Sequence, residues 1–129
     1  MVVIAKSNPV ESLFEHTNNV VKNIHDVQLL YGQKILNVLP EPYKQYFWEA
    51  LELSCKAHDL GKAQSCFQAK ILENILKYDK IGCNGDYKKK YKQYSDLIRD
   101  NQLKEIPHNI LSPAFIKNHT NFFPEEIRR

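Results

Sequence analysis

The 129-residue chain lacks several features that would assign it to a whole class of proteins. It has three cysteines, an odd number without a CxxC pair, and no secretory leader, so we expect free thiols in a reducing compartment. No apolar run approaches the roughly 20 residues that a membrane-spanning helix needs. These absences predict a soluble, cytoplasmic protein without a membrane partner.

Strong net charge and strand-like alternation are lacking as well. The net charge is +3 and the pI about 8.7, so the overall charge does not demand a nucleic-acid partner. No segment alternates apolar and polar residues convincingly, whereas apolar residues recur at three- and four-residue spacing. With 43% hydrophobic residues, the chain can bury one core, and we expect a single all-α domain over residues 1–129.

The helical spacing predicts four main helices, each with a proline or glycine near an end. Between the third and the fourth, two glycines and many lysines and tyrosines predict a loop that leads into a short polar helix. The main helices are expected from Pro9 to a break near Gly32, after Pro42 to about Gly61, over residues 63–78, and onward from Pro107.

Three histidines lie on apolar helical stripes, His16, His58 and His108, and Asp59 directly follows the second of them. Imidazoles combined with a carboxylate suit a borderline divalent metal, which lowers the pKa of a bound water. The alternative is that each histidine bonds a backbone carbonyl in the core, while Asp59 caps a helix or pairs with Lys62. The spacing leaves both interpretations open.

Residues around the His-Asp pair add weight to the metal interpretation. Gly61 removes side-chain bulk beside the pair, and Lys62 adds a cation that can bind an oxyanion. A second pair, His25-Asp26, lacks the following Gly-Lys and is expected on the surface. His119 lies in the polar stretch "KNHTN" and is also expected to be exposed, outside the site.

A basic and aromatic cluster follows the third predicted helix. Its lysines could contact the phosphates of a single strand while its tyrosines stack on unpaired bases. The alternative is a solvated lysine face with the tyrosines packed on the body of the protein. The candidate nucleic-acid-binding residues are Lys88, Lys89, Lys90, Tyr91 and Lys92.

Four segments occur in the order "AKS", "SLFEHT", "AHDLGKAQSCFQ" and "IPHNILSPAF". Together they resemble the HD-superfamily nuclease domain of the CRISPR type I helicase-nuclease, the Cas-three family, over most of the chain up to about Phe115. The resemblance implies an HD-domain helical bundle that cleaves single-stranded DNA with a metal-activated water. It also implies two partners, an RNA-guided surveillance complex and a helicase domain or subunit.

The resemblance also implies roles for individual residues. His16, His58, Asp59 and His108 would be ligands of one or two divalent ions, of Mn, Ni, Fe or Co, with Mg as a further option. Asp59 and Lys62 would serve catalysis, the lysine by holding the scissile phosphate or developing charge.

One part of the family pattern is missing. A histidine pair on a following helix and a later aspartate do not occur in this chain, which ends at "FFPEEIRR". We therefore expect the N-terminal part of a longer domain, incomplete at its C-terminal end, with one weakly held ion or none.

The sequence is compatible with two other functions. An HD-type phosphohydrolase acting on nucleotides would use the same ligands, and a closed pocket with few cations beyond Lys62 would favour it over an elongated basic channel. A non-catalytic helical binding module would retain the His-Asp residues without affinity for metal.

Overall fold

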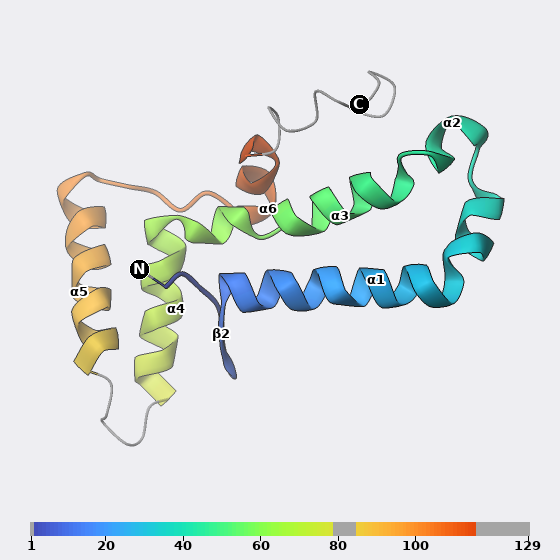
Figure 1. The fold of residues 1–129 in the computed structure, drawn as a ribbon. Coiled ribbons are helices and arrows are strands. Elements are labelled where there is room, and N and C mark those ends of the chain that lie inside the picture. Colours follow the sequence, from blue (N-terminus) through green and yellow to red (C-terminus); the bar gives the residue numbers. More distant parts are fainter. Residues whose placement is uncertain (1, 79–84, 116–129) are drawn as a thin grey trace.

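The computed structural model describes residues 2–78 and 85–115, and most of them are helical (Figure 1). The predicted helical character is confirmed, with one small β-hairpin in addition. None of the helices in these two ranges has the length and apolar character that crossing a membrane requires. In chain order the elements are β1 (Ile4–Ser7), β2 (Val10–Ser12), α1 (Leu13–Val38), α2 (Glu41–Lys44), α3 (Phe47–Ala57), the 3₁₀ helix η1 (Leu60–Ala63), α4 (Ser65–Tyr78), α5 (Gly85–Asp100), α6 (His108–Leu111) and the 3₁₀ helix η2 (Ser112–Phe115).

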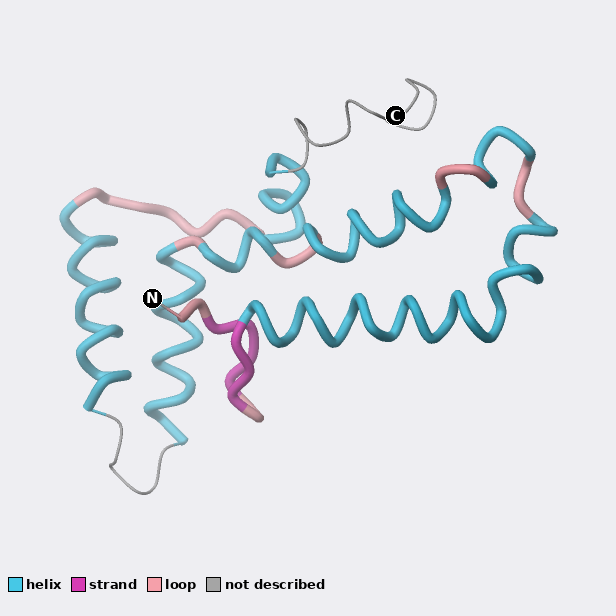
Figure 2. The backbone as a smooth tube through the Cα atoms, in the orientation of Figure 1, coloured by secondary structure: helices cyan, strands magenta, loops and turns pink. Residues whose placement is uncertain are grey.

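The N-terminal hairpin was not predicted from the sequence. Strands β1 and β2 pair antiparallel, with Ser7 opposite Val10 (Figure 2). Asn8 and Pro9, predicted to open a helix, lie instead in the turn between the strands and are joined by a cis peptide bond. Strands of four and three residues are too short for alternation to be recognisable.

Helix α1 begins at Leu13, where a capping box fixes its first turn. The Ser12 hydroxyl accepts from the Glu15 backbone N–H, and the Glu15 carboxylate accepts from the Ser12 N–H, both at 3.1 Å. The predicted break near Gly32 is wrong, because α1 continues to Val38. Helices α1 and α3 run antiparallel, joined through α2 (Figure 1).

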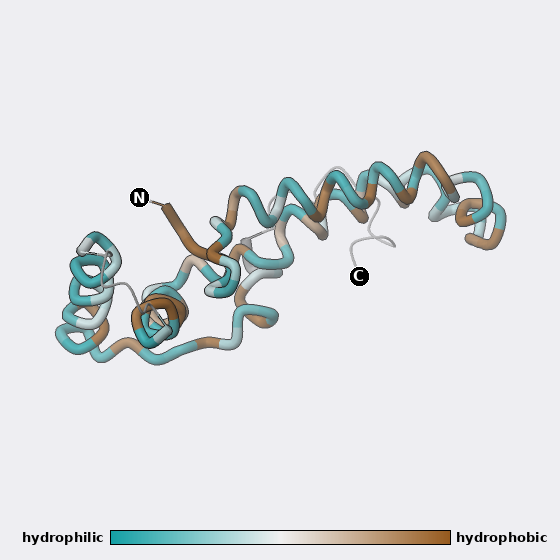
Figure 3. Tube along the Cα trace, turned by 90° about the horizontal axis from the view of Figure 1, so that it is seen from below, coloured by the Kyte–Doolittle hydropathy of each residue, from teal (hydrophilic) through white to brown (hydrophobic). Residues whose placement is uncertain are grey.

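The apolar core is small and lies where β1 packs on α4. It contains Ile4, Ile71, Leu72 and Ile75, and α5 covers its other side (Figure 3). Helix α5 covers residues 85–100 and is longer than the predicted short helix. The partly buried rings of Tyr87, Tyr91 and Tyr94 pack against this core.

The buried side chain of Gln68 joins three elements. Its Oε1 accepts from the Ile4 N–H at 3.0 Å, and its Nε2 donates to the Ile4 carbonyl at 2.8 Å. The same Nε2 donates to the Lys62 carbonyl at 2.8 Å. This amide therefore holds β1 and η1 against α4 much as a neighbouring strand would hold β1.

Replacing Gln68 should destabilise the whole fold. Gln68→Leu leaves two buried backbone groups of Ile4 and the part-buried Lys62 carbonyl without this partner, so we expect the free energy of unfolding to fall by about 2–4 kcal/mol. Urea titration followed by circular dichroism measures the change. The matched control is Gln93→Leu on the exposed face of α5, which should change stability by less than about 0.5 kcal/mol. Equal effects of the two substitutions would contradict the role of Gln68.

Candidate metal centre

The four predicted ligands come from different elements and meet at one place. His16 is the fourth residue of α1, and His58 and Asp59 form the link between α3 and η1. His108 is the first residue of α6. Helix α3 ends at Ala57, and the contacts of Asp59 with His16 and His108 show that its carboxylate lies between α1 and α6.

The Asp59 carboxylate is at the centre of the group, and its side chain is only 5% exposed. The His16 Nε2 lies 3.0 Å from Asp59 Oδ2, and the His58 Nε2 lies 3.2 Å from the same oxygen. The His108 Nε2 is 3.7 Å from the other oxygen, Oδ1. Three imidazoles therefore surround one buried carboxylate.

Hydrogen bonds at the far side of two rings orient them toward Asp59. The His58 Nδ1 is 2.6 Å from the Cys55 backbone carbonyl, which can only accept, so Nδ1 carries a proton. The His16 Nδ1 is likewise 3.1 Å from Glu11 Oε2. These bonds select the neutral tautomers in which Nδ1 carries the proton, so the Nε2 lone pairs of both rings face the Asp59 carboxylate. The lone pairs and the carboxylate are all acceptors. Such an arrangement needs either a cation between them or a second proton on each ring.

The donor atoms fit a divalent transition metal. Those of His16, His58 and Asp59 lie within 4.8 Å of one another. Bonds of about 2.0–2.2 Å place neighbouring ligands of a tetrahedral or octahedral ion about 2.8–3.6 Å apart. Both histidine distances to Asp59 Oδ2 fall in this range, and His108 lies just beyond it. The structure therefore brings three of the four predicted ligands together and places the fourth at the edge of the group.

Glu11 is a residue of the site that the sequence analysis missed. Its carboxylate contacts the His16 ring and also accepts from Lys6 Nζ and from Asn19 Nδ2, both at 2.9 Å. The hydrogen bonds of Lys6 and Asn19 lower the pKa of Glu11 from 4.5 to about 2. An ionised Glu11 can therefore hold the Nδ1–H of His16 and keep Nε2 directed at Asp59.

Lys62 supplies the positive charge nearest to Asp59. Its Nζ is 2.6 Å from Asp59 Oδ2, the oxygen that the His16 and His58 rings also face. A buried carboxylate requires such a partner. A divalent ion bonded to this oxygen would repel the ammonium, so Lys62 and a metal compete for Asp59, and a displaced Lys62 is free to bind an anion.

Position 61, directly after His58, Asp59 and Leu60, has no room for a side chain. A Cβ at this position would lie 2.5 Å from the His108 carbonyl oxygen and 2.8 Å from its Cα. The Gly61 N–H also donates to the buried Ser112 hydroxyl at 2.9 Å. Gly61 therefore lets α6 approach η1 closely enough to bring His108 to Asp59.

Gln64, which the sequence analysis also missed, holds the segment before α6. Its Oε1 accepts from the Ile106 N–H at 2.9 Å, and its Nε2 donates to the Ile106 carbonyl. The same Nε2 donates to the Gly61 carbonyl at 3.1 Å. Gln64 and Gln68 are four residues apart, a spacing that is equally typical of an exposed helix face. The sequence therefore does not indicate that their amides bind distant backbone atoms.

The group opens to solvent on one side. The side chains of Asp59 and His16 are 5% and 13% exposed, whereas those of His58 and His108 are each 39% exposed. His58 is therefore only partly buried, although it lies on an apolar stripe of the sequence. A hollow of about 330 Å³ between α3 and η2 borders His58, so a substrate can approach from this side.

The basic cluster lies apart from this group, on α5. The side chains of Lys88, Lys89 and Lys92 are exposed, Lys90 is half-buried, and the half-buried Tyr91 ring packs on the core. The tyrosines thus pack on the body of the protein, as the alternative interpretation predicted. Within the two described ranges, no hydrogen bond or ion pair joins this cluster to the four ligands.

The remaining candidates take no part in the group. His25 is exposed and contacts Glu52 at 3.0 Å, in agreement with the predicted surface position. Cys55 and Cys66 are free and half-buried, and burial raises the pKa of the Cys55 thiol. Cys83 and His119 lie outside the described residues.

Adding a methyl group at two glycines should have opposite effects. Gly61→Ala forces α6 away from η1, so we expect a lower melting temperature and displacement of His108. Gly32→Ala places a Cβ at ordinary contact distance, 3.6 Å from Trp48, and should stabilise α1 by up to about 1 kcal/mol. Thermal unfolding of both variants measures this difference, and a stabilising Gly61→Ala would contradict the close approach.

The competition between Lys62 and a metal is also testable. In EDTA, Lys62→Met should lower the free energy of unfolding by about 2–3 kcal/mol, because Asp59 loses its buried partner. Adding Mn²⁺ or Ni²⁺ should then stabilise this variant more than it stabilises the wild type. Lys70→Met, at an exposed lysine, is the control, with a change of less than about 0.5 kcal/mol. Equal metal-induced stabilisation of wild type and Lys62→Met would exclude the competition.

Comparison with protein-family models, with curated proteins and with solved structures finds no match to this chain. What the group does must therefore be inferred from its own residues and their arrangement.

Proposed function

We propose that His16, His58 and Asp59, with His108 beside them, form the metal centre of a phosphodiesterase that cleaves single-stranded DNA. The observation that carries this proposal is the position of the two Nε2 atoms, 3.0 and 3.2 Å from one buried carboxylate oxygen. Their Nδ1 atoms are engaged elsewhere, so this arrangement is suited to a shared cation. A salt-bridged core histidine would need only one such contact.

The chain's own residues would perform three tasks in this reaction. A divalent ion bound here supplies Lewis acidity and an activated water at neutral pH. His16, His58 and Asp59 hold the ion, and Glu11 fixes the orientation of the His16 ring. Lys62, once displaced from Asp59, neutralises a nonbridging phosphate oxygen as charge develops on it.

The proposed biological setting is CRISPR type I interference, in which the chain would act as an HD-domain nuclease with a surveillance complex and a helicase. Its support is the order of the sequence segments together with the convergence of their His and Asp residues. The exposed lysines 88, 89 and 92 on α5 offer a positively charged surface for the strand. The three donor groups that lie together are enough to hold one ion, so we propose an ion of Mn, Ni, Fe or Co, with Mg as a further option.

A nucleotide phosphohydrolase is the second candidate, because one observation favours it. A hollow of about 360 Å³ lies beside Phe67, whose ring is in edge contact with His108. This volume is at the lower end of the range for small-molecule sites and can hold a single free nucleotide.

Hydrolysis assays separate the two candidates. With Mn²⁺ or Ni²⁺ present, we expect cleavage of an end-labelled single-stranded oligonucleotide and little release of phosphate from mononucleotides. His58→Ala and Asp59→Asn should each lower the rate at least about 100-fold, since both remove a ligand of the ion. His25→Ala, at the exposed histidine of the other His-Asp pair, should retain wild-type activity.

Two results would contradict the proposal. Cleavage that survives in both ligand variants would exclude this group as the active site. An absence of metal binding by the wild type, measured by calorimetry, would leave a non-catalytic module as the better description.

A further inference from the structure

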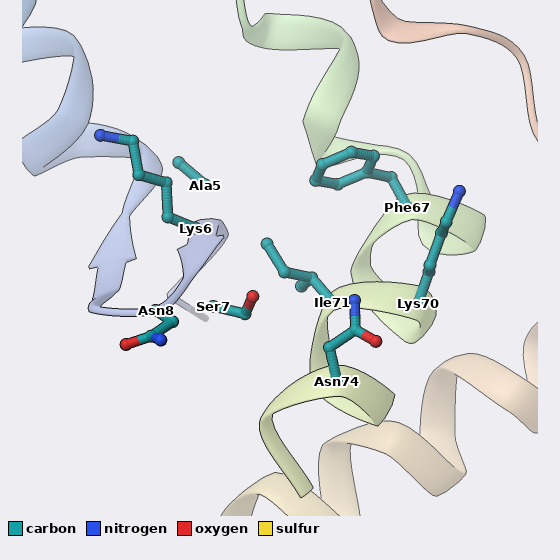
Figure 4. Close-up of a pocket in the computed structure, with 8 residues that line it drawn as sticks. All are labelled: Ala5, Lys6, Ser7, Asn8, Phe67, Lys70, Ile71 and Asn74. Carbon is teal, nitrogen blue, oxygen red and sulfur yellow. The ribbon is translucent and has the colours of Figure 1, made fainter. Parts of the chain in front are cut away.

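A hollow of about 360 Å³ lies between the N-terminal hairpin and α4 (Figure 4). Phe67 connects it with the metal centre, because its ring centroid lies 5.7 Å from that of His108 and 5.9 Å from Lys62 Nζ. If Lys62 binds a phosphate of the substrate, the part of the substrate next to that phosphate can therefore reach this hollow.

One face of α4 forms the apolar and polar wall of the hollow. Phe67, Lys70, Ile71 and Asn74 follow one another at three- and four-residue spacing, so they lie on the same face of the helix. Phe67 and Ile71 supply a ring and an aliphatic surface. Lys70 and Asn74 supply a cation and an amide at the rim.

The hairpin supplies the opposite wall. In Figure 4 the Ser7 hydroxyl is directed across the hollow toward α4, and Asn8 lies beside it in the turn. The amides of Asn8 and Asn74 make no hydrogen bond within the described part of the chain, so both can bind a ligand. The Lys6 amine points away from the hollow to Glu11, 2.9 Å from its Oε2.

The apolar, amide and cationic surfaces of the hollow together indicate which kind of ligand fits it. A nucleobase has apolar faces, which suit Phe67 and Ile71, and a polar edge, which amide groups can bind. The phosphate of the same nucleotide is attracted by Lys70 at the rim and by Lys62 at the metal centre.

We propose that this hollow holds the base of the nucleotide next to the phosphate that is cleaved, with Asn74 contacting the edge of the base and Lys70 its phosphate. The proposal rests on the proposed phosphodiester cleavage for the position of the scissile phosphate. The binding of a nucleotide itself, free or within a strand, does not depend on cleavage.

Binding is tested without metal, so that it is independent of activity. In EDTA, titration with dTMP, dAMP and a phosphorothioate hexathymidylate should shift the side-chain amide signals of Asn74 and Asn8 in ¹⁵N NMR spectra. Deoxyribose 5-phosphate, which has no base, should shift them much less. Equal shifts with the base-free sugar phosphate would overturn the proposal.

Substitutions on the same helix test the residues. Asn74→Ala and Lys70→Gln should each weaken nucleotide binding about fivefold. Asn23→Ala and Lys22→Gln, at exposed positions of α1 that do not line the hollow, are the matched controls and should bind as the wild type does. Equal affinities of the pocket and control variants would refute the proposal.

A cleavage assay then relates the hollow to the reaction. Replacing the base beside the cleaved bond by an abasic unit should raise the KM of the wild type, with kcat changing less than KM, and should have little effect in Asn74→Ala. Amide shifts without any cleavage would support the nucleotide site and oppose the nuclease. Cleavage without amide shifts would support the nuclease and oppose the nucleotide site.

Discussion

A single buried carboxylate, that of Asp59, imposes the main constraint on this structure. A charged side chain that is only 5% exposed is tolerated only where cations or hydrogen-bond donors surround it. Here those groups come from α1, from the link between α3 and η1, from η1 itself and from α6. Elements far apart in the sequence are thus brought together around one side chain, and the chemistry proposed for the protein uses the same convergence.

Part of this arrangement could be predicted from the sequence. The three- and four-residue spacing of apolar residues locates the helices, and the His-Asp pair before Gly61 locates the centre of the group. The contribution of Glu11 could not be predicted, since it acts on His16 from five residues earlier through a strand that is too short to recognise. The two interpretations of Asp59, as ligand and as partner of Lys62, could not be separated because both use the same oxygen.

The α5 segment shows a different limit of sequence patterns. Its lysines and tyrosines alternate in a way that suits both a strand of nucleic acid and an amphipathic helix. The structure shows that the tyrosine rings pack on Ile71, Leu72 and Ile75. Only the exposed lysines are then available to contact a negatively charged partner. The remote half of the α1 and α3 pair is packed much less, with Leu29 84% exposed and Val38 81% exposed. Local opening should therefore begin there and not around Asp59.

Within residues 2–78 and 85–115, the side-chain amides of the two glutamines bind main-chain atoms only. Gln68 binds those of Ile4 and Lys62, and Gln64 binds those of Ile106 and Gly61. Every residue type except proline presents the same N–H and C=O groups. Mutational drift at position 106, whose side chain faces solvent, can therefore proceed without moving His108. The side-chain amides of Gln64 and Gln68, by contrast, have to be retained. The positions of the groups around Asp59 therefore depend on two residues that do not contact Asp59.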